Sequence, residues 1–390
     1  MREQRAIDLR IEARLAFVSL GSIEEWFALG RDGERRAETI GDEERRLASI
    51  VIRAAALNFY GTPYEALSAG EEAVALANRL NSSIWLALAE YGLGQSYFLA
   101  GRFRDSERWL GQASARLIKA PENVPPGTTG SSLLVLCQMM KAMSCSWLGE
   151  FDEAERCTRT ATDRAERSDR PYDLVAASYG LGVVRMLLGS MDEAEIAFDQ
   201  ALRVSRESEI RLFLPPILTA LGNIYSQRGK AVLARDILLQ AKHEAEALGH
   251  QTSMVAVSPY LGTALSNLGK VADGLALTRA CQASAKQKGY GATEALANLA
   301  EAGILSSQGP AAFDEAVVCA QRTIAIAERL EAAPLRALAR GLLSRLYLTS
   351  GRTIEARDEL IQAIALFDKS KMTVHLERAK ATLSKFSDTS

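Results

Sequence analysis

Leu93 to Ala113 read LGQSYFLAGRFRDSERWLGQA, and this stretch decides the fold. Gly101 separates two helical patterns, the first of which places Leu93, Gly94 and Tyr97 on one face. The second pattern has a stripe at spacings of three, four and three residues, made of Phe103, Ser106, Leu110 and Ala113. A glycine ends a helix at least cost because it adopts the left-handed conformation freely. The stretch therefore predicts two antiparallel helices in close contact, joined at Gly101.

Gly101 belongs to a ladder of turn glycines that runs through the whole chain. Its counterparts are Gly21, Gly61, Gly149, Gly189, Gly229, Gly269, Gly309 and Gly351. Neighbouring members of the ladder stand about 40 residues apart, and the longest step is the one from Gly101 to Gly149. A fixed period of this size is typical of a stacked solenoid, in which each repeat contacts mainly its neighbours.

The positions around these glycines resemble the tetratricopeptide repeat, although the units here are longer, at about 40 residues, than is usual for that repeat. The chain is also similar to the C-terminal repeat region of bacterial class III adenylate cyclase/ATPase fusion signalling proteins. That similarity lies in four runs: ALNFYGTPYEAL, AEYGLGQSYFLAGR, RLFLPP and SKMTVHLERAKA. The resemblance implies a right-handed superhelix with the first helix of each repeat on its concave side.

We therefore predict an all-α fold, a right-handed superhelical solenoid of about nine 40-residue helix-turn-helix repeats that forms one domain over residues 1–390. The repeats are expected at about 4–41, 44–81, 84–120, 132–170, 172–209, 213–249, 253–289, 292–331 and 335–370. A capping helix is expected at 372–386. The first helix begins at the initiator methionine without a polar cap, as expected of a chain cut or descended from a longer protein.

Three places should depart from regular repeats. Prolines and glycines forbid continuous helix at 119–132, which predicts an inserted loop that is either surface decoration or a binding element. Pro259 interrupts a helical pattern and predicts a kink or a late start at Ser258. Phe313 and Ala316 stand about four residues late after Gly309, which predicts a longer turn.

Charge and composition exclude several classes of protein. Lys plus Arg number 46 against 48 Asp plus Glu, so no general attraction to nucleic acid or anionic membrane is expected. No apolar run is long enough to span a bilayer or to serve as a signal peptide, which predicts a cytoplasmic protein. The five cysteines have no close pairs, so we expect buried, reduced thiols.

No motif predicts catalysis, a metal or a cofactor. His243 and His250 in HEAEALGH are seven positions apart, whereas a zinc-protease helix places two histidines four apart. Gly222 and Gly229-Lys230 have the wrong spacing for a phosphate-binding loop. The chain is therefore predicted not to be an enzyme, and any cyclase or ATPase activity would reside in a domain absent from it.

The resemblance implies that residues ten, six and three positions before each turn glycine face inward. Arg185 is added as the only charge in YGLGVVRMLLG, where other repeats have tyrosine. It is expected either to receive a partner's carboxylate or to pair with Asp192 or Glu195. The predicted partner-binding residues are Tyr91, Gln95, Phe98, Met143, Tyr179, Arg185, Met186, Asn223 and Arg345.

The aromatic and methionine-rich middle of this surface suits an extended peptide or a partner helix. The predicted function is a non-catalytic protein-interaction scaffold or a regulatory region of a bacterial signalling protein. Its partner would be a protein or peptide, with a cognate cyclase or ATPase domain as one option. The alternative is a peptide or small-ligand sensor whose superhelix changes pitch on binding.

Overall fold

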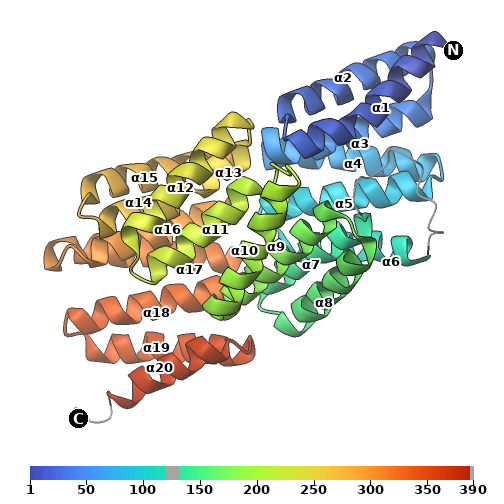
Figure 1. Ribbon diagram of the computed structural model, residues 1–390. Coiled ribbons are helices and arrows are strands. Elements are labelled where there is room, and N and C mark those ends of the chain that lie inside the picture. Colours follow the sequence, from blue (N-terminus) through green and yellow to red (C-terminus); the bar gives the residue numbers. More distant parts are fainter. Residues whose placement is uncertain (120–131, 387–390) are drawn as a thin grey trace.

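The computed structural model describes residues 1–119 and 132–386, and every regular element within these ranges is helical (Figure 1). This confirms the predicted all-α superhelical repeat array. The loop predicted at 119–132 falls, for residues 120–131, outside the described residues. None of the described helices combines the length and the apolar character that crossing a membrane requires.

The helices pair along the chain as first and second members of successive repeats. The first members are α1 (Arg2–Leu20), α3 (Glu43–Tyr60), α5 (Ser83–Leu99), α7 (Leu133–Leu148), α9 (Pro171–Leu188), α11 (Leu214–Gln227), the broken helix α13 (Gln251–Ala256) and α14 (Ser258–Asn267), α16 (Gly291–Ser306) and α18 (Ala333–Thr349). The second members are α2 (Ile23–Ile40), α4 (Pro63–Arg79), α6 (Phe103–Lys119), α8 (Phe151–Ser168), α10 (Met191–Glu207), α12 (Ala231–Ala247), α15 (Val271–Lys288), α17 (Phe313–Arg329) and α19 (Thr353–Lys369). A last helix, α20 (Thr373–Ser384), packs on α19.

Small residues bring the two helices of a repeat together, as the sequence predicts. A Cβ atom built on Gly94 of α5 would lie 2.7 Å from Cγ of Leu110 on α6. The same atom on Gly222 of α11 would lie 2.5 Å from Cγ of Leu238 on α12. Real Cβ contacts essentially never fall below 3.0 Å. Any larger residue at either position would push its helix pair apart.

The turn glycines adopt the predicted left-handed conformation at most rungs, but the prediction is wrong at Gly61. Gly101 has φ +77°, whereas Gly61 is extended with φ −95° and ψ −164°. There Thr62 forms a capping box with Glu65, and Pro63 occupies the first turn of α4. Because this cap starts the second helix directly, the chain needs no left-handed residue before it.

Two of the predicted irregularities are confirmed. Val257 separates α13 from α14, and Pro259 lies in the first turn of the second piece, where its missing N–H costs no hydrogen bond. A 3₁₀ turn, Pro310–Ala312, lengthens the connection before α17. The kink lies between Gly229 and Gly269, which keep the 40-residue spacing, whereas the 3₁₀ turn lies between Gly309 and Gly351, which are 42 residues apart.

The superhelix closes on itself, because parts of the chain that are far apart in sequence come into contact. The hydroxyl of Tyr290 donates a hydrogen bond of 2.9 Å to the carbonyl of Gly61, 229 positions away. The hydroxyl of Thr252, on α13, donates one of 3.0 Å to the carbonyl of Asn58, and α13 lies beside α3 (Figure 1). One superhelical turn therefore contains between five and six repeats. We call these contacts between residues 21–189 and residues 248–375 the seam.

The turn glycines of the early repeats lie on the seam. A Cβ atom on Gly101 would lie 3.0 Å from Cδ2 of Leu330, and one on Gly149 would lie 2.5 Å from Oγ of Ser370. Among the atoms of the described part of the chain, none lies within 4 Å of a Cβ built on the later rungs Gly229, Gly269, Gly309 and Gly351. The early glycines thus have two roles: they allow the left-handed connection between two helices, and they leave room for the close contact across the seam.

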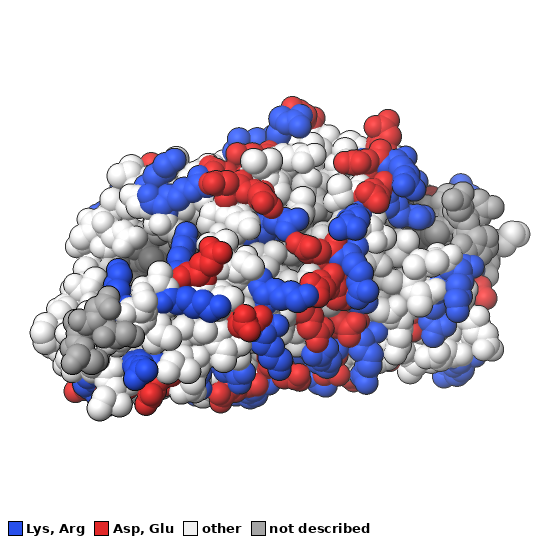
Figure 2. All heavy atoms as spheres, turned by 90° about the horizontal axis from the view of Figure 1, so that it is seen from below, with Lys and Arg blue, Asp and Glu red and all other residues white. Residues whose placement is uncertain are grey.

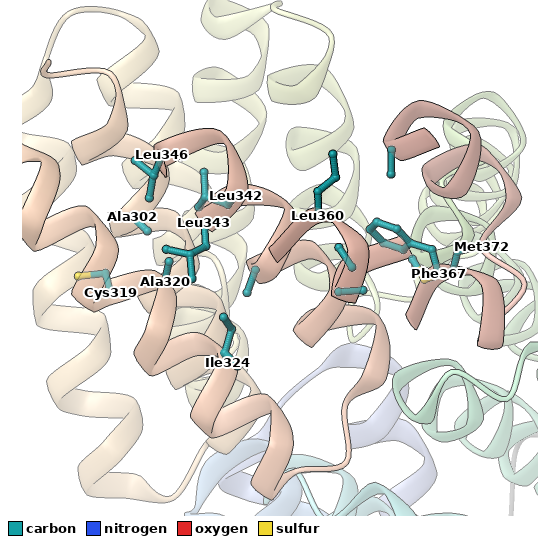
Figure 3. Packing of buried hydrophobic residues seen from close by; sticks show 14 of the residues in the cluster. Ala302, Cys319, Ala320, Ile324, Leu342, Leu343, Leu346, Leu360, Phe367 and Met372 are labelled. Atoms are coloured by element: carbon teal, nitrogen blue, oxygen red, sulfur yellow. The ribbon is translucent and has the colours of Figure 1, made fainter. Parts of the chain in front are cut away.

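Apolar clusters also cross the seam. Phe103 is fully buried, stacks on Trp147 at 5.2 Å between ring centroids, and shares a cluster with Leu330 and Leu335. In the C-terminal repeats, side chains of α16 to α19 point toward one another, among them Leu343 and the others shown in Figure 3. That cluster includes residues of α7, α8 and α9, so the core is continuous between the two superhelical turns.

Candidate functional site

A cavity of about 280 Å³ lies inside the superhelix. Its walls come from eight helices, α3, α5, α7, α9, α11, α13, α14 and α16, together with residues just before three of them. All eight are first helices of their repeats. The volume lies near the lower end of the range for small-molecule pockets, about 300–1,000 Å³. Its position and its mostly apolar lining make it the main candidate site.

Most of the predicted partner-binding residues line this cavity. The seven that do are Tyr91, Gln95, Phe98, Met143, Tyr179, Met186 and Asn223. They come from α5, α7, α9 and α11, which form one side of the cavity. Their role in binding a partner remains a prediction.

Arg185 does not line the cavity, and its predicted ion pairs are wrong. Its guanidinium pairs with Glu155 at 2.6 Å and with Glu193 at 2.9 Å, whereas Asp192 and Glu195 had been expected. The helical register explains the outcome. Arg185 stands four positions before its turn glycine, next to the inward position at three. Neighbouring residues of a helix point to different faces, so the Arg185 side chain points toward α8 and α10 and away from the cavity.

Arg345 also lies outside the cavity lining. It stands six positions before Gly351, in the inward register, but its helix α18 contributes no residue to the cavity walls. Its side chain is exposed, and within the described residues no carboxylate pairs with it. Surrounding protein lowers the pKa of Arg345 by desolvation.

Buried amides fix one polar edge of the cavity. Asn58 is 1% exposed, and its amide donates to the carbonyl of Gly92 at 3.3 Å and to Oε1 of Gln95 at 3.4 Å. Its oxygen accepts a hydrogen bond of 2.8 Å from the hydroxyl of Ser96. This network ties α3 to α5 and holds the Gln95 side chain in place at the wall. On the other edge, the Asn223 amide donates to Sδ of Met186 at 3.5 Å.

Four tyrosines supply neutral hydroxyl groups to the cavity walls. Burial raises the pKa of Tyr260 to about 12 and also raises the pKa values of Tyr91, Tyr172 and Tyr179. Within the described ranges these four hydroxyls make no hydrogen bond. Tyr172 and Tyr179 pack edge-on against Phe213, at 5.4 Å and 5.8 Å between ring centroids. Packing therefore fixes the rings of Tyr172 and Tyr179, while the hydroxyl groups of all four tyrosines remain free to bind a ligand.

His250 lies on the far wall of the cavity and caps α13. Its Nδ1 accepts a hydrogen bond of 3.2 Å from the backbone N–H of Ser253, and its ring packs edge-on against Phe59 at 5.1 Å. Burial lowers the pKa of His250 to about 4. The imidazole is therefore neutral near pH 7, and protonating it would both charge a buried site and remove the cap.

This burial predicts an acid-sensitive contribution to stability. Between about pH 6.5 and 4 the unfolded chain binds a proton at His250 and the folded chain does not, so stability falls as the pH is lowered through that range. The loss should be on the order of 2 kcal/mol at pH 5. His250→Asn keeps a good cap without a titrating group, so its unfolding free energy should fall less between pH 7.5 and 5.

Urea unfolding at the two pH values, followed by circular dichroism, measures this difference. His243 is exposed and serves as the matched control, because His243→Asn should keep the full pH dependence of the wild type. Equal pH dependence in His250→Asn and in the wild type would contradict the buried neutral imidazole.

The positions ten, six and three residues before each turn glycine predict residues on one side of the cavity and none on the other. The missed residues include Phe59, Tyr172, Phe213, Thr219, His250, Tyr260, Tyr290 and Leu296. Thr219 could have been found, because it stands ten positions before Gly229. The residues on α13, α14 and α16 face the cavity only because the superhelix closes, and no local signal marks that closure.

Metal and redox chemistry find no support in the described residues. Within residues 1–119 and 132–386, no group of three or more His, Cys, Asp or Glu side chains could hold a metal ion. The five cysteines are free and buried, and burial raises the pKa of the Cys157 thiol to about 12. Such thiols are poor nucleophiles at neutral pH.

The outer surface carries mixed charge. Figure 2 shows Lys and Arg interspersed with Asp and Glu over the face it presents. Many charged side chains of the protein form ion pairs, such as Arg53 with Glu34 at 2.7 Å and Arg340 with Glu359 at 2.6 Å. The pairing fits the near-zero net charge of −2.

Comparison with known proteins supports the fold. No protein-family model matches the chain, and no curated protein sequence matches it. Solved structures similar to it over most of its length include a Rap protein complexed with competence and sporulation factor (14% identity, 87% of this chain and 99% of that one, TM-score 0.56), the Rap conjugation gene regulator of plasmid pLS20 in complex with the Phr* peptide (12%, 95% and 97%, 0.59), and NprR in complex with its cognate peptide NprX (10%, 82% and 85%, 0.56).

These neighbours are tetratricopeptide-like helical repeat proteins, so they confirm that the chain is a repeat array of this kind. At such low identity the likeness extends to the fold alone. None of the three is described as an adenylate cyclase or an ATPase. The cyclase context suggested by the sequence therefore has no support from them.

Proposed function

We propose that this protein is a non-catalytic, ligand-responsive scaffold. A peptide or small molecule held in the cavity would fix the pitch of the superhelix and so change the surface offered to a partner protein. One observation carries the proposal: residues of α5 to α11 and residues of the next superhelical turn, on α13, α14 and α16, line the same cavity. A ligand there contacts both turns at once.

This arrangement couples ligand binding in the cavity to closure of the seam. A ligand that touches Met143 on one wall and Tyr260 or Leu296 on the other gains its full contacts only while the seam is closed. Such a ligand shifts the equilibrium by its difference in affinity for the closed and open states. At a concentration of 100 times its Kd, it would stabilise the folded protein by about 2.7 kcal/mol.

The geometry favours a sensor over an open peptide-binding groove. The inward residues of the middle repeats lie inside a cavity that α13 to α16 cover from the opposite side. A cavity near the lower limit for small-molecule pockets accommodates a small ligand, or a few side chains of a peptide. Among the described residues that line it there is no Asp, Glu, Lys, Arg or Cys, which supports a role without catalysis.

A matched pair of variants tests the proposal. Ala256→Phe places a ring in the cavity wall, whereas Ala272→Phe places the same ring on the exposed face of α15. A thermal-shift screen of short peptides and small metabolites should give compounds that raise the Tm of the wild type and of Ala272→Phe by several degrees. The same compounds should leave the Tm of Ala256→Phe unchanged.

Hydrogen exchange then tests closure with any compound so found. The amides around Gly61 and Tyr290, which meet at the seam, should exchange more slowly with the compound bound. The proposal would be overturned if no compound stabilised the protein. It would also be overturned if the compounds stabilised Ala256→Phe as strongly as the wild type.

A narrower proposal concerns the signalling context. We propose a cytoplasmic regulatory role next to an adenylate cyclase or ATPase domain, supported by the four sequence runs that resemble the repeat region of such fusion proteins. Adding the purified array to a cognate cyclase domain should change its cyclase activity. If the cyclase activity did not change at a saturating concentration of the array, the cyclase proposal would be wrong. The proposal of a ligand-responsive scaffold would be unaffected.

A further inference from the structure

The described wall of the cavity is uncharged. Among its described lining residues there is no Asp, Glu, Lys or Arg, although these four types make up 24% of the chain. We propose that the cavity selects an uncharged, largely apolar small molecule with a ring-shaped body and at least one hydrogen-bonding group. This inference rests on the proposed function and specifies the chemical class of its ligand.

The apolar part of the wall is suited to a flat ring. Met139, Met140, Met143 and Met186 line it from α7 and α9. Methionine side chains are flexible and polarisable, so they adapt to the shape of a ring and contact it favourably. The rings of Phe98, Trp147 and Phe213, and others nearby, add rigid faces and edges for aromatic contacts.

The polar part of the wall offers neutral groups only. The hydroxyls of Tyr91, Tyr172, Tyr179 and Tyr260 make no hydrogen bond within the described ranges, and the amide of Asn223 lies on the same wall. These groups border the cavity, and the four tyrosine residues are half-buried. A ligand carbonyl, hydroxyl or amide gains a hydrogen bond by pairing with one of these groups, so the wall selects for such a group.

An ionised ligand would be disfavoured. Moving an ion out of water costs several kcal/mol unless a counter-charge and hydrogen bonds compensate it. The imidazole of His250, the most basic group in the lining, is neutral at physiological pH. A carboxylate, a phosphate or a free peptide terminus would therefore enter the cavity without a counter-ion.

Two dyes with one ring skeleton test this selectivity on the full chain. N-phenyl-1-naphthylamine is neutral, and 8-anilino-1-naphthalenesulfonate adds a single sulfonate to the same rings. Fluorescence titration should show saturable binding of the neutral dye at one site, with a Kd at least tenfold lower than that of the sulfonate. A sulfonate Kd equal to or lower than that of the neutral dye would overturn the proposal.

Charge placed in the wall should reverse the preference. Met186→Lys should weaken binding of the neutral dye at least tenfold and should strengthen binding of the sulfonate. Met191→Lys introduces the same charge on α10 outside the cavity lining and should bind both dyes as the wild type does. Met186→Leu keeps the wall apolar and should retain the neutral-dye preference, so selectivity can be judged even if Met186→Lys does not fold.

A peptide ligand is a distinguishable outcome. If a short apolar peptide with free ends displaced the neutral dye as well as its acetylated and amidated form did, charged termini would be tolerated and the proposal would be wrong. If the neutral dye bound selectively without slowing exchange at the seam, ligand-driven closure would fail and the ligand class would stand. If the sulfonate bound as tightly, the ligand class would fail whatever the seam did.

Discussion

Replacing Phe103 by alanine is expected to lower the free energy of unfolding by about 3–5 kcal/mol, the cost of truncating a fully buried phenylalanine. The loss should extend beyond its own repeat. Phe103 is 0% exposed, lies between Phe98 and Trp147, and shares its cluster with Leu330 of the next superhelical turn. We therefore expect faster amide exchange around Leu330 and a larger radius of gyration by small-angle scattering.

Phe198 provides the matched control. It is equally buried, at 0% exposure, and its cluster consists of residues between Tyr91 and Ile237, with none from the 248–375 side of the seam. Phe198→Ala should cost a similar free energy of unfolding and should leave exchange around Leu330 unchanged. If both variants altered that exchange equally, the seam would not depend on Phe103.

Gly149→Ala is expected to be the most damaging of the conservative changes on the glycine ladder. Gly149 has φ +82°, where a residue with a Cβ costs about 1–2 kcal/mol. The new Cβ would also lie 2.5 Å from Oγ of Ser370 and 3.3 Å from Cβ of Ala333, across the seam. Overpacking of this kind adds on the order of 1–3 kcal/mol. Urea unfolding measures the sum.

Gly229→Ala separates the two effects. Gly229 has φ +73°, but no atom lies within 4 Å of its would-be Cβ, so only the backbone cost should appear. Adding Ser370→Gly to Gly149→Ala removes the closest contact and should recover part of the lost stability. The same addition to Gly229→Ala should recover none. Equal losses for the two alanine variants would contradict the close approach at Gly149.

The sequence predicted the elements of this fold because each repeat follows local rules. A left-handed glycine, a small residue beside a leucine and a stripe on the second helix recur in most of the repeats, and each is a short-range signal. The inward register on α5 to α11 follows from the same periodicity, so Tyr91, Met143 and Asn223 could be placed on one side of the cavity. Gly61 was misassigned because a capping box replaces the usual turn there.

The seam and the far side of the cavity could not be predicted, because they depend on the curvature of the whole array. Whether Tyr260 and His250 meet Tyr91 and Phe98 across a cavity is decided by small rotations accumulated over more than five repeats. The sequence pattern also could not predict which acidic residues pair with Arg185. Arg185 has acidic residues on both neighbouring helices, and only their relative positions select Glu155 and Glu193.

The seam also changes how the chain reaches its native state. Ordinary solenoids are nearly one-dimensional, so each unit can become stable as soon as its neighbour exists. Here the second repeat leaves the ribosome long before its contact at Tyr290 is synthesised, 229 residues later. Contacts so distant in sequence are slow to form, because a long loop must close first. The early repeats therefore lack their seam contacts, including those of Phe103 with Leu330, until the later repeats have been synthesised and the seam can form.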